Sequence, residues 1–211
     1  HNIKYILTGA NYSTECVRNP IEWMYYQSDS IQLRDIHARF GQRPLKNFPV
    51  TSILRHKIYL PFVKKIRVAR PLNYLPYTKN DAVELLEKEY GWQPYPQKHF
   101  ESRFTRFYES YWLYERFGYD TRKVQFSSLI LTGQMTREEA LEKLQHPPYD
   151  EETIQHDFEF IATKLALTTE ELNSYMDLPH KTYRDYRSQE SIYSVGALVM
   201  RWLGMERGGK R

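Results

Sequence analysis

The sequence has little of what disulfide-bonded, zinc-binding or membrane-spanning proteins need. Its single cysteine, Cys16, cannot form a disulfide within the chain, and zinc sites built on several cysteines are excluded. No stretch approaches the ~18 consecutive apolar residues of a membrane helix, and no charged region followed by an apolar run marks a signal peptide. We therefore expect a soluble protein of a reducing compartment, the cytoplasm, with no membrane partner.

A strong excess of charge of one sign is also missing. The 30 lysines and arginines are interleaved with 26 aspartates and glutamates, which leaves a formal net charge of +4. This mild balance favours a small anionic ligand over a nucleic acid as the partner. Hydrophobic residues make up 41% of the 211 residues, enough to build a core.

The N-terminal part shows an α/β rhythm. The aliphatic run 3–8 predicts a buried strand, and 66–69 predicts a second strand that ends before a proline. A helix is expected from near Asn80 to Tyr90, and further helices at 31–40, closed by a glycine, and at 52–63. Because the chain opens on a strand without an initiator Met, we expect a fragment whose sheet has further strands upstream.

From about residue 98 onward the pattern is almost wholly helical. The expected segments lie near 101–117, 121–131, 137–145, 151–165, 169–177 and 189–203. Thr136 and Thr168 each begin a Thr-x-x-Glu capping box. Amphipathic spacing places Phe158, Ile161 and Leu165 on one helix face, and we expect the last helix to pack against the core rather than lie on a membrane.

A small turn after the first strand is the first candidate site. Gly9 would let the backbone approach a ligand, Thr8 and Asn11 can hydrogen-bond a nucleotide, and Glu15 can hold a magnesium ion that bridges phosphates. An ordinary turn followed by an acidic helix N-terminus explains the same residues.

Residues 98–107 are the second candidate, with three cations, one imidazole and two hydroxyls in ten residues. In a helix, Ser102, Thr105 and Arg106 share one face and could meet one anionic group. The alternative is a solvated basic face with the phenylalanines at 100, 104 and 107 in the core. Farther along, the adjacent Ser127 and Ser128 indicate close helix packing rather than a nucleophile, since no base is paired with them.

These stretches resemble known families. Residues 8–15 are similar to the Gly-Thr-x-Asn-x-Ser-Glu segment of ammonia-dependent NAD synthetases, which are PP-loop ATP pyrophosphatases, with one extra residue before the glutamate. The C-terminal halves of N-acetyl sugar amidotransferases are similar over about residues 3–187. The shared motifs are Lys-His-x-Glu-Ser at 98–102, Arg-Lys and a Ser-Ser helix at 122–128, Gly-Gln-x-Thr-Arg-Glu-Glu-Ala at 133–140, and Pro-Pro-Tyr-Asp at 147–150. The last two dozen residues show no such resemblance.

The resemblance implies an α/β fold. Residues 1–95 would be the C-terminal part of a Rossmann-like PP-loop domain, related to the adenine nucleotide alpha hydrolases, with a parallel sheet. A mostly α-helical substrate or partner region would follow at 96–187, and an amphipathic helix with a basic tail at 188–211.

The activity implied by the resemblance is ATP-dependent conversion of an acetamido group to an acetamidino group. The sugar would be nucleotide-activated or acidic, in bacterial O-antigen and lipopolysaccharide synthesis. ATP with Mg²⁺ would adenylylate the amide oxygen, and ammonia would then displace AMP. The ammonia would come from a glutaminase subunit similar to that of histidine biosynthesis, in many members with a cyclase-like channel subunit. The family's Ser-Gly-Gly-x-Asp-Ser loop is absent here, so we expect this chain alone not to hydrolyse ATP.

The resemblance also assigns roles to the residues of the three stretches. Nucleotide contacts fall on Thr8, Gly9 and Asn11, and the magnesium ion on Glu15. The candidate catalytic residues are Lys98, His99 and Arg106, with His99 able to transfer a proton. The residues expected to contact the sugar or its phosphates are Glu101, Ser102, Arg103, Thr105, Arg122 and Lys123.

Three alternatives stay open at this point. Another PP-loop ligase, NAD synthetase-like or tRNA-modifying, would keep the ATP chemistry with a different acceptor. The helical tail could be a non-catalytic docking module for the glutaminase, through Ile192, Val195, Val199 and Trp202. Residues 189–211 could also form an interfacial membrane helix, because Trp202 is followed by basic residues.

Overall fold

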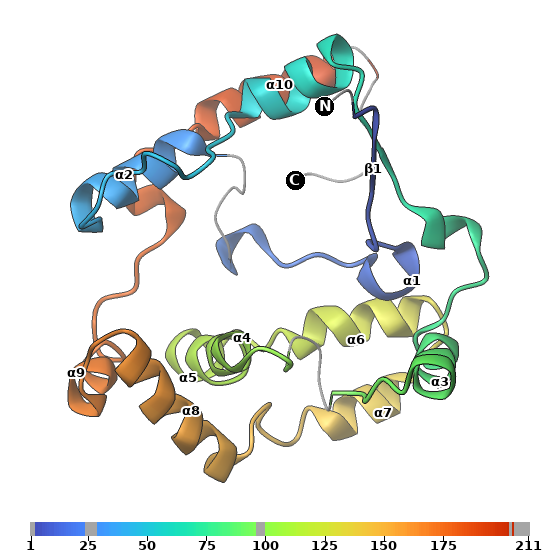
Figure 1. Ribbon diagram of the computed structural model, residues 1–211, viewed down its shortest axis with the longest axis vertical. Coiled ribbons are helices and arrows are strands. Elements are labelled where there is room, and N and C mark those ends of the chain that lie inside the picture. Colours follow the sequence, from blue (N-terminus) through green and yellow to red (C-terminus); the bar gives the residue numbers. More distant parts are fainter. Residues whose placement is uncertain (1–2, 24–28, 96–99, 203, 205–211) are drawn as a thin grey trace. The chain divides into compact units, whose positions relative to one another are not determined.

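The chain folds into two compact units whose segments alternate along the sequence. The computed structural model describes residues 3–23, 29–95, 100–202 and 204 (Figure 1). The first unit comprises His1–Ile6, Pro20–Ala69 and Lys181–Arg211, and the second comprises Leu7–Asn19 and Arg70–His180. The turn after the first strand thus belongs to the same unit as the helical region, although the sequence placed the two in different domains.

A small parallel sheet lies in the first unit. Strand β1 (Tyr5–Leu7) is paired with β2 (Arg67–Ala69), and the backbone N–H of Arg67 donates to the carbonyl of Lys4 at 2.8 Å. Both predicted strands are confirmed, but the expected burial of the first is wrong, since all three β1 residues are exposed. A two-stranded sheet needs another layer of structure packed on it to bury its apolar side chains.

Three helices of the first unit lie at the expected positions, namely α2 (Ser30–Phe40), η2 (Arg55–Val63) and α10 (Glu190–Trp202). Two short 3₁₀ helices, η1 (Ile21–Trp23) and η5 (Tyr183–Asp185), were not expected from the sequence. The element η2 is a π-helix, in which the N–H of Lys64 donates to the carbonyl of Tyr59. Pro61 lies inside it and has no N–H for the regular α-helical ladder, which accounts for the wider turn.

A buried carboxylate joins the second and third segments of this unit. One oxygen of Asp29 caps α2 by accepting from the backbone N–H groups of Ile31 and Gln32. The other accepts from the hydroxyl of Ser188 at 2.9 Å and from the N–H of Gln189 at 2.6 Å. These polar contacts attach the segment that leads into α10.

The expected core packing of α10 is wrong. The structure buries none of its described residues, and the side chain of Trp202 is 84% exposed. The helix is attached through the polar contacts of Ser188 and Gln189 at its start. Its apolar face is left uncovered by the described residues. Within the described parts of the chain, no helix combines the length and the apolar character needed to cross a membrane.

The second unit is helical. Its elements are α1 (Tyr12–Glu15), η3 (Pro71–Tyr74), α3 (Lys79–Tyr90), α4 (Arg103–Arg106), η4 (Phe107–Trp112), α5 (Leu113–Phe117), α6 (Arg122–Leu131), α7 (Arg137–Lys143), α8 (Glu151–Lys164) and α9 (Thr169–Ser174). The predicted helices are confirmed, and both capping boxes form as expected, from Thr136 to Glu139 and from Thr168 to Glu171.

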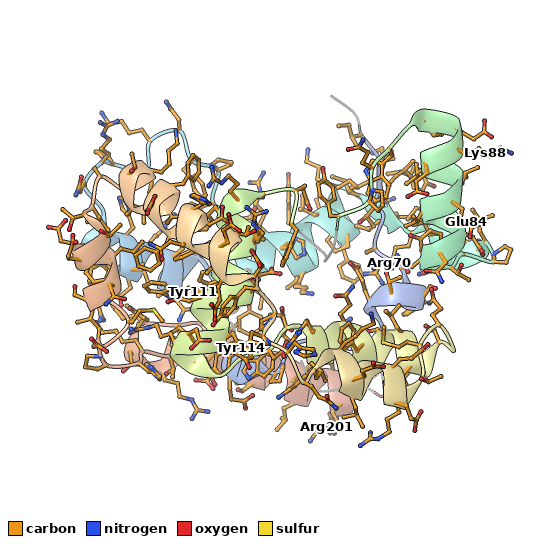
Figure 2. All side chains as sticks on the ribbon, turned by 90° about the horizontal axis from the view of Figure 1, so that it is seen from below. Arg70, Glu84, Lys88, Tyr111, Tyr114 and Arg201 are labelled. Carbon is orange, nitrogen blue, oxygen red and sulfur yellow. The ribbon has the colours of Figure 1, made fainter. Side chains whose placement is uncertain are left out.

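The core of the second unit lies between η4, α8 and α9. It consists of Phe107, Ile154, Phe158, Ile161, Ala162 and Leu172. The rings of Phe107 and Phe158 meet edge to face with centroids 5.6 Å apart. Tyr111 packs against this core, and Figure 2 shows it and Tyr114 on the same helical segment. Phe107, Phe158 and Ile161 are buried as expected, whereas Phe104 and Leu165 are about half exposed.

Candidate functional site

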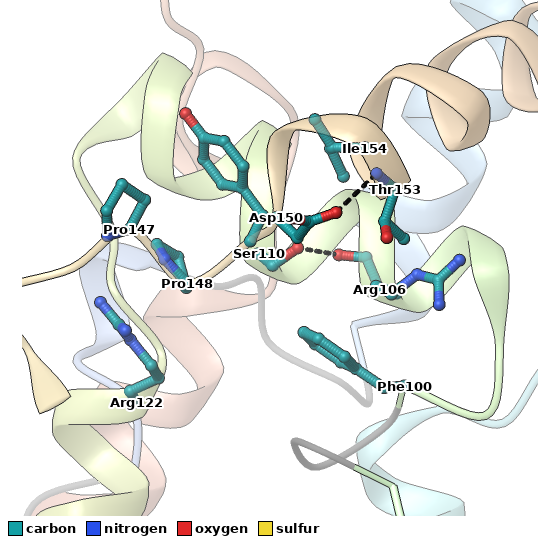
Figure 3. A pocket seen from close by; sticks show the side chains of 10 residues that line it. Phe100, Arg106, Ser110, Arg122, Pro147, Pro148, Asp150, Thr153 and Ile154 are labelled. Atoms are coloured by element: carbon teal, nitrogen blue, oxygen red, sulfur yellow. Dashed lines mark hydrogen bonds between the residues drawn. The ribbon is translucent and has the colours of Figure 1, made fainter.

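The second unit contains a cavity of about 360 Å³ beside the core (Figure 3). It lies where α4 and η4 face the start of α8. Its lining residues are Phe100, Arg106, Ser110, Arg122, Pro147, Pro148, Tyr149, Asp150, Thr153 and Ile154. A cavity of this size, with apolar walls and a few polar groups, is the usual form of a small-molecule site.

The turn that precedes α8 forms one wall of the cavity. Pro147 and Pro148 restrict the backbone there, and Asp150 follows as the N-cap of α8. The Asp150 carboxylate accepts from the backbone N–H of Thr153 at 2.8 Å, and this hydrogen bond lowers the pKa of Asp150. The carboxylate at the cavity rim is therefore ionised at neutral pH.

Arg106 lines the cavity and is ion-paired to a buried carboxylate. Its Nε donates to Asp157 at 2.6 Å and its Nη2 at 2.8 Å, while the Nε of Arg103 donates to the same carboxylate at 2.8 Å. Burial alone would raise the pKa of Asp157, but the hydrogen bonds from Arg106 and Arg103 outweigh it and hold that pKa below its usual value. Asp157 is fully buried and orients the Arg106 guanidinium.

Arg122, on the far side of the cavity, is held in the same manner. Its guanidinium forms a buried ion pair with Asp120, the closest contact being 2.7 Å. It also donates to the carbonyl of Lys143, the last residue of α7, and to the carbonyl of His146 in the following turn. Asp120 balances the charge of Arg122 one to one, whereas Asp157 is shared by Arg103 and Arg106, so that cluster keeps one net positive charge beside the cavity.

Tyr149 is held protonated at the cavity edge. Its hydroxyl donates to Glu115 at 2.6 Å. Burial, followed by the hydrogen bond to Glu115 and the charge of that carboxylate, raises the pKa of the tyrosine well above its ordinary value. Tyr149 is thus a neutral hydrogen-bonding wall rather than a base.

The structure brings together only part of the predicted sugar and phosphate contacts. Arg106 and Arg122 both line the cavity. Ser102 instead caps α4, accepting from the N–H of Thr105 at 3.3 Å and from its hydroxyl at 3.0 Å. The anionic group that Arg106 meets is the chain's own Asp157.

The other residues of this prediction lie on the surface or outside the described residues. Arg103 packs its guanidinium over the ring of Phe160 at 4.2 Å. Glu101 and Lys123 are exposed. Lys98 and His99 lie outside the described residues, so their proposed catalytic roles stay predictions.

The turn proposed to contact the nucleotide is organised by its own side chains. Asn11 is buried and caps α1, accepting from the N–H of Thr14 at 2.9 Å and donating to the carbonyl of Gly9 at 3.2 Å. Thr8 accepts from the N–H of Ala10 at 3.3 Å. These bonds engage the Thr8 and Asn11 side chains, whereas a Cβ at Gly9 would meet nothing within 4 Å. The open backbone at Gly9 fits close approach of a ligand.

Magnesium ligation by Glu15 stays a prediction. Its side chain is exposed, and the described residues contain no group of three or more histidine, cysteine, aspartate or glutamate side chains placed to hold a metal ion. A single carboxylate fits magnesium only where phosphate oxygens and water complete the coordination.

Sequence reasoning missed the two buried carboxylates, Asp157 and Asp120. A signal was present for the first, because Asp157 stands next to Phe158 on the apolar face of an amphipathic helix. A carboxylate at such a position needs a buried cation, and Arg103 and Arg106 are one helical turn apart. Ser128 is buried as expected, and its hydroxyl accepts from the N–H of Val17 at 3.0 Å, which confirms close packing of α1 on α6.

The cavity lies in the part of the chain that resembles a known protein family. Residues 101–200 match the family model described as "LPS biosynthesis protein WbpG-like, C-terminal domain". This match supports a relationship to WbpG-like proteins and a role in lipopolysaccharide biosynthesis. It includes nearly all of α10, which corrects the expectation that the last two dozen residues fall outside the resemblance. No curated protein and no solved structure was found to match.

Proposed function

We propose that the protein is an ATP-dependent amidotransferase of lipopolysaccharide biosynthesis. It would convert an acetamido group of a sugar to an acetamidino group, with ammonia supplied by a glutaminase partner. The observation that carries the proposal is that the cavity and its two oriented arginines lie almost wholly within the family-matched stretch.

The cavity residues suit a sugar that carries an acetamido group. Pro147, Pro148 and Ile154 offer apolar surface to a ring face. The guanidinium of Arg106, held by Asp157, can donate to a carbonyl or hydroxyl oxygen of the ligand. Because Asp157 balances only one of the two guanidinium charges that it contacts, Arg106 can also meet an anionic group of the substrate.

Ammonia cannot displace the amide oxygen directly. ATP would adenylylate that oxygen with release of pyrophosphate, so that the oxygen leaves as part of AMP when ammonia adds to the carbon. In this proposal the turn at Thr8–Asn11 approaches the nucleotide through its backbone, with Gly9 as the point of closest contact. Holding the amide near the nucleotide makes the transfer effectively intramolecular, which is the main contribution that bound geometry makes to rate.

The test is an assay of the full-length protein with ATP, magnesium, ammonium and a panel of acetamido sugars. We expect sugar-dependent pyrophosphate release, and a product in which NH has replaced the carbonyl oxygen, identified by its mass. Pyrophosphate release without any dependence on sugar would favour another PP-loop ligase. No ATP consumption with any sugar, with ammonium or with glutamine and the glutaminase, would overturn the proposal.

Cavity variants link that activity to this site. Thr153→Phe fills the cavity without touching either ion pair, and should raise the KM for the sugar at least about tenfold while the melting temperature changes little. Arg137→Gln, an exposed arginine at the start of α7, is the control and should leave the KM unchanged. Equal kinetics of Thr153→Phe and the wild type would place the sugar elsewhere.

A further inference from the structure

The turn between α6 and α7 reaches across to the segment at 8–15. Helix α6 ends at Leu131, and Gly133 follows with a positive φ of 71°. This conformation brings the N–H of Gln134 to the carbonyl of Leu129 at 2.8 Å, the usual closure of a helix C-terminus. This bond fixes the backbone of Gln134, and with it the direction in which the side chain leaves the turn.

The side-chain amide of Gln134 joins three segments of the second unit. Its Nε2 donates to the carbonyl of Ser13 at 2.7 Å and to the Ser13 hydroxyl at 2.9 Å. Its Oε1 accepts from the backbone N–H of Lys79 at 2.8 Å. The hydroxyl of Thr132 donates to the same Ser13 carbonyl at 2.8 Å. One amide therefore ties α1 to the start of α3 and to the end of α6.

Neighbouring contacts hold the same segment from the other side. The hydroxyl of Ser13 donates to the carbonyl of Tyr77 at 2.7 Å. The backbone N–H of Tyr12 donates to the side-chain carbonyl of Asn73 at 2.9 Å. The four-residue helix α1 is too short to be stable without such attachments.

The partners of Gln134 leave only one orientation for its amide. The carbonyl of Ser13 requires a donor, and the N–H of Lys79 requires an acceptor. An isosteric glutamate would place a carboxylate oxygen against the Ser13 carbonyl, where two acceptors repel. Gln134→Glu should therefore disrupt this contact more than Gln134→Ala, although it keeps the shape of the side chain.

We infer that Gln134, assisted by Thr132, is a positioning residue that holds the turn at Thr8–Asn11 in its ligand-binding conformation. Asn11 is the N-cap of α1, so the orientation of α1 sets the orientation of the turn. The part of this inference that concerns ATP rests on the proposed function, in which the turn contacts the nucleotide. Neither Gln134 nor Thr132 needs to touch the ligand.

Hydrogen exchange of the 211-residue chain tests the positioning without any substrate. In Gln134→Glu, the N–H of Tyr12, bonded to Asn73, should exchange about tenfold faster than in the wild type. The N–H of Val17, anchored separately by Ser128, should change little. Gln145→Glu, the same chemical change at an exposed glutamine, is the control and should leave both rates unchanged. Unchanged exchange at Tyr12 in Gln134→Glu overturns the inference.

Kinetics of the full-length protein test the consequence for the ligand. Gln134→Glu should raise the KM for ATP about tenfold and leave the KM for the sugar unchanged, with Thr132→Val giving a smaller effect of the same kind. An equal rise of both KM values, or a rise in neither, contradicts a role in positioning this turn for ATP. If the wild type consumes no ATP, the proposed function fails and so does the ATP part of the inference. The exchange result then decides the positioning of the turn independently.

Discussion

The two units differ in how they are held together. The second unit buries a core of aromatic and aliphatic side chains, among them Phe107 and Phe158. In the first unit, the hydrophobic side chains buried among the described residues are Ile53 and Tyr183, and the buried Asp29 carboxylate links two of its chain segments by hydrogen bonds. Packing of apolar surface thus stabilises one unit, while hydrogen bonds between chain segments stabilise the other.

This difference bears on where a site can be built. The cavity and the turn at Thr8–Asn11 both belong to the unit with the core, which can hold side chains in fixed positions. The first unit exposes apolar residues on both its sheet and its last helix, including Ile6, Val68 and Trp202. Parallel sheets are normally covered on both faces, whereas the residues of this sheet are mostly exposed.

The largest effect on stability is expected from truncating the central ring of the core. Phe107→Ala should lower the free energy of unfolding of the second unit by about 4 kcal/mol, because it leaves a cavity among well-packed rings. Phe104→Ala, three residues earlier and about half exposed, is the matched control and should cost less than about 1 kcal/mol. Urea unfolding followed by circular dichroism measures both. Similar losses for the two variants would mean that Phe107 is not central to the core.

The buried carboxylate beneath the cavity should give the next largest effect. Asp157→Asn removes the acceptor charge for Arg103 and Arg106 and should cost about 3 kcal/mol at neutral pH. The pKa of Asp157 is lowered in the folded state. The ionised carboxylate therefore stabilises the fold above the ordinary aspartate pKa of about 4, and this stabilisation is lost as the pH falls through the lowered pKa. The variant should therefore lose less stability than the wild type on acidification, in urea titrations at several pH values. Parallel pH profiles of the two proteins would contradict this account of the ion pair.

A smaller loss, of about 2 kcal/mol, is expected in the first unit when Asp29 is replaced. Asp29→Ala removes both the cap of α2 and the bonds to Ser188 and Gln189. Asp29→Asn keeps one acceptor for the cap and should cost only about half as much. Hydrogen exchange of the Gln189 N–H reports the attachment alone and should be fast in both variants. The difference in stability between the two variants then reports the cap. Protection of that N–H in Asp29→Asn would show that the attachment does not depend on the second carboxylate oxygen.

The smallest effect is expected for the exposed face of α10. Val195→Ser and Trp202→Ser should change the stability of the chain by less than about 0.5 kcal/mol, since neither side chain is buried. Thermal unfolding of each variant measures the change. A loss of more than about 2 kcal/mol would show that this face is packed in solution, as the sequence had suggested.

Local sequence signals predicted the helices well. The caps at Thr136 and Thr168, and the glycine after Tyr90, are short-range features, and the structure forms each of them. Burial was harder to predict, because the same apolar spacing describes a helix packed in a core and one left exposed. Leu165 continues the face of Phe158 and Ile161 yet ends up half exposed after the helix terminates.

The candidate site could be predicted only in part. The sequence identified Arg106 and Arg122 as residues of interest, and both line the cavity. It could not show that Arg106 would be paired with Asp157, because the two residues are 51 positions apart and the pairing depends on how α8 crosses α4. The attachment of Ser13 to Gln134 was hidden for the same reason, since the two residues are 121 positions apart. The pairing of Arg122 with Asp120, two residues earlier, is local and was missed.

Native-state hydrogen exchange across the whole chain, measured at increasing urea concentrations, tests the central contrast most directly. The account predicts that amides of α8 exchange only through global opening of the second unit, at a higher free energy than the amides of α2 in the first unit. A single opening free energy shared by α2 and α8, or the slower exchange in α2, would contradict the claim that the site rests on the more stable of the two units.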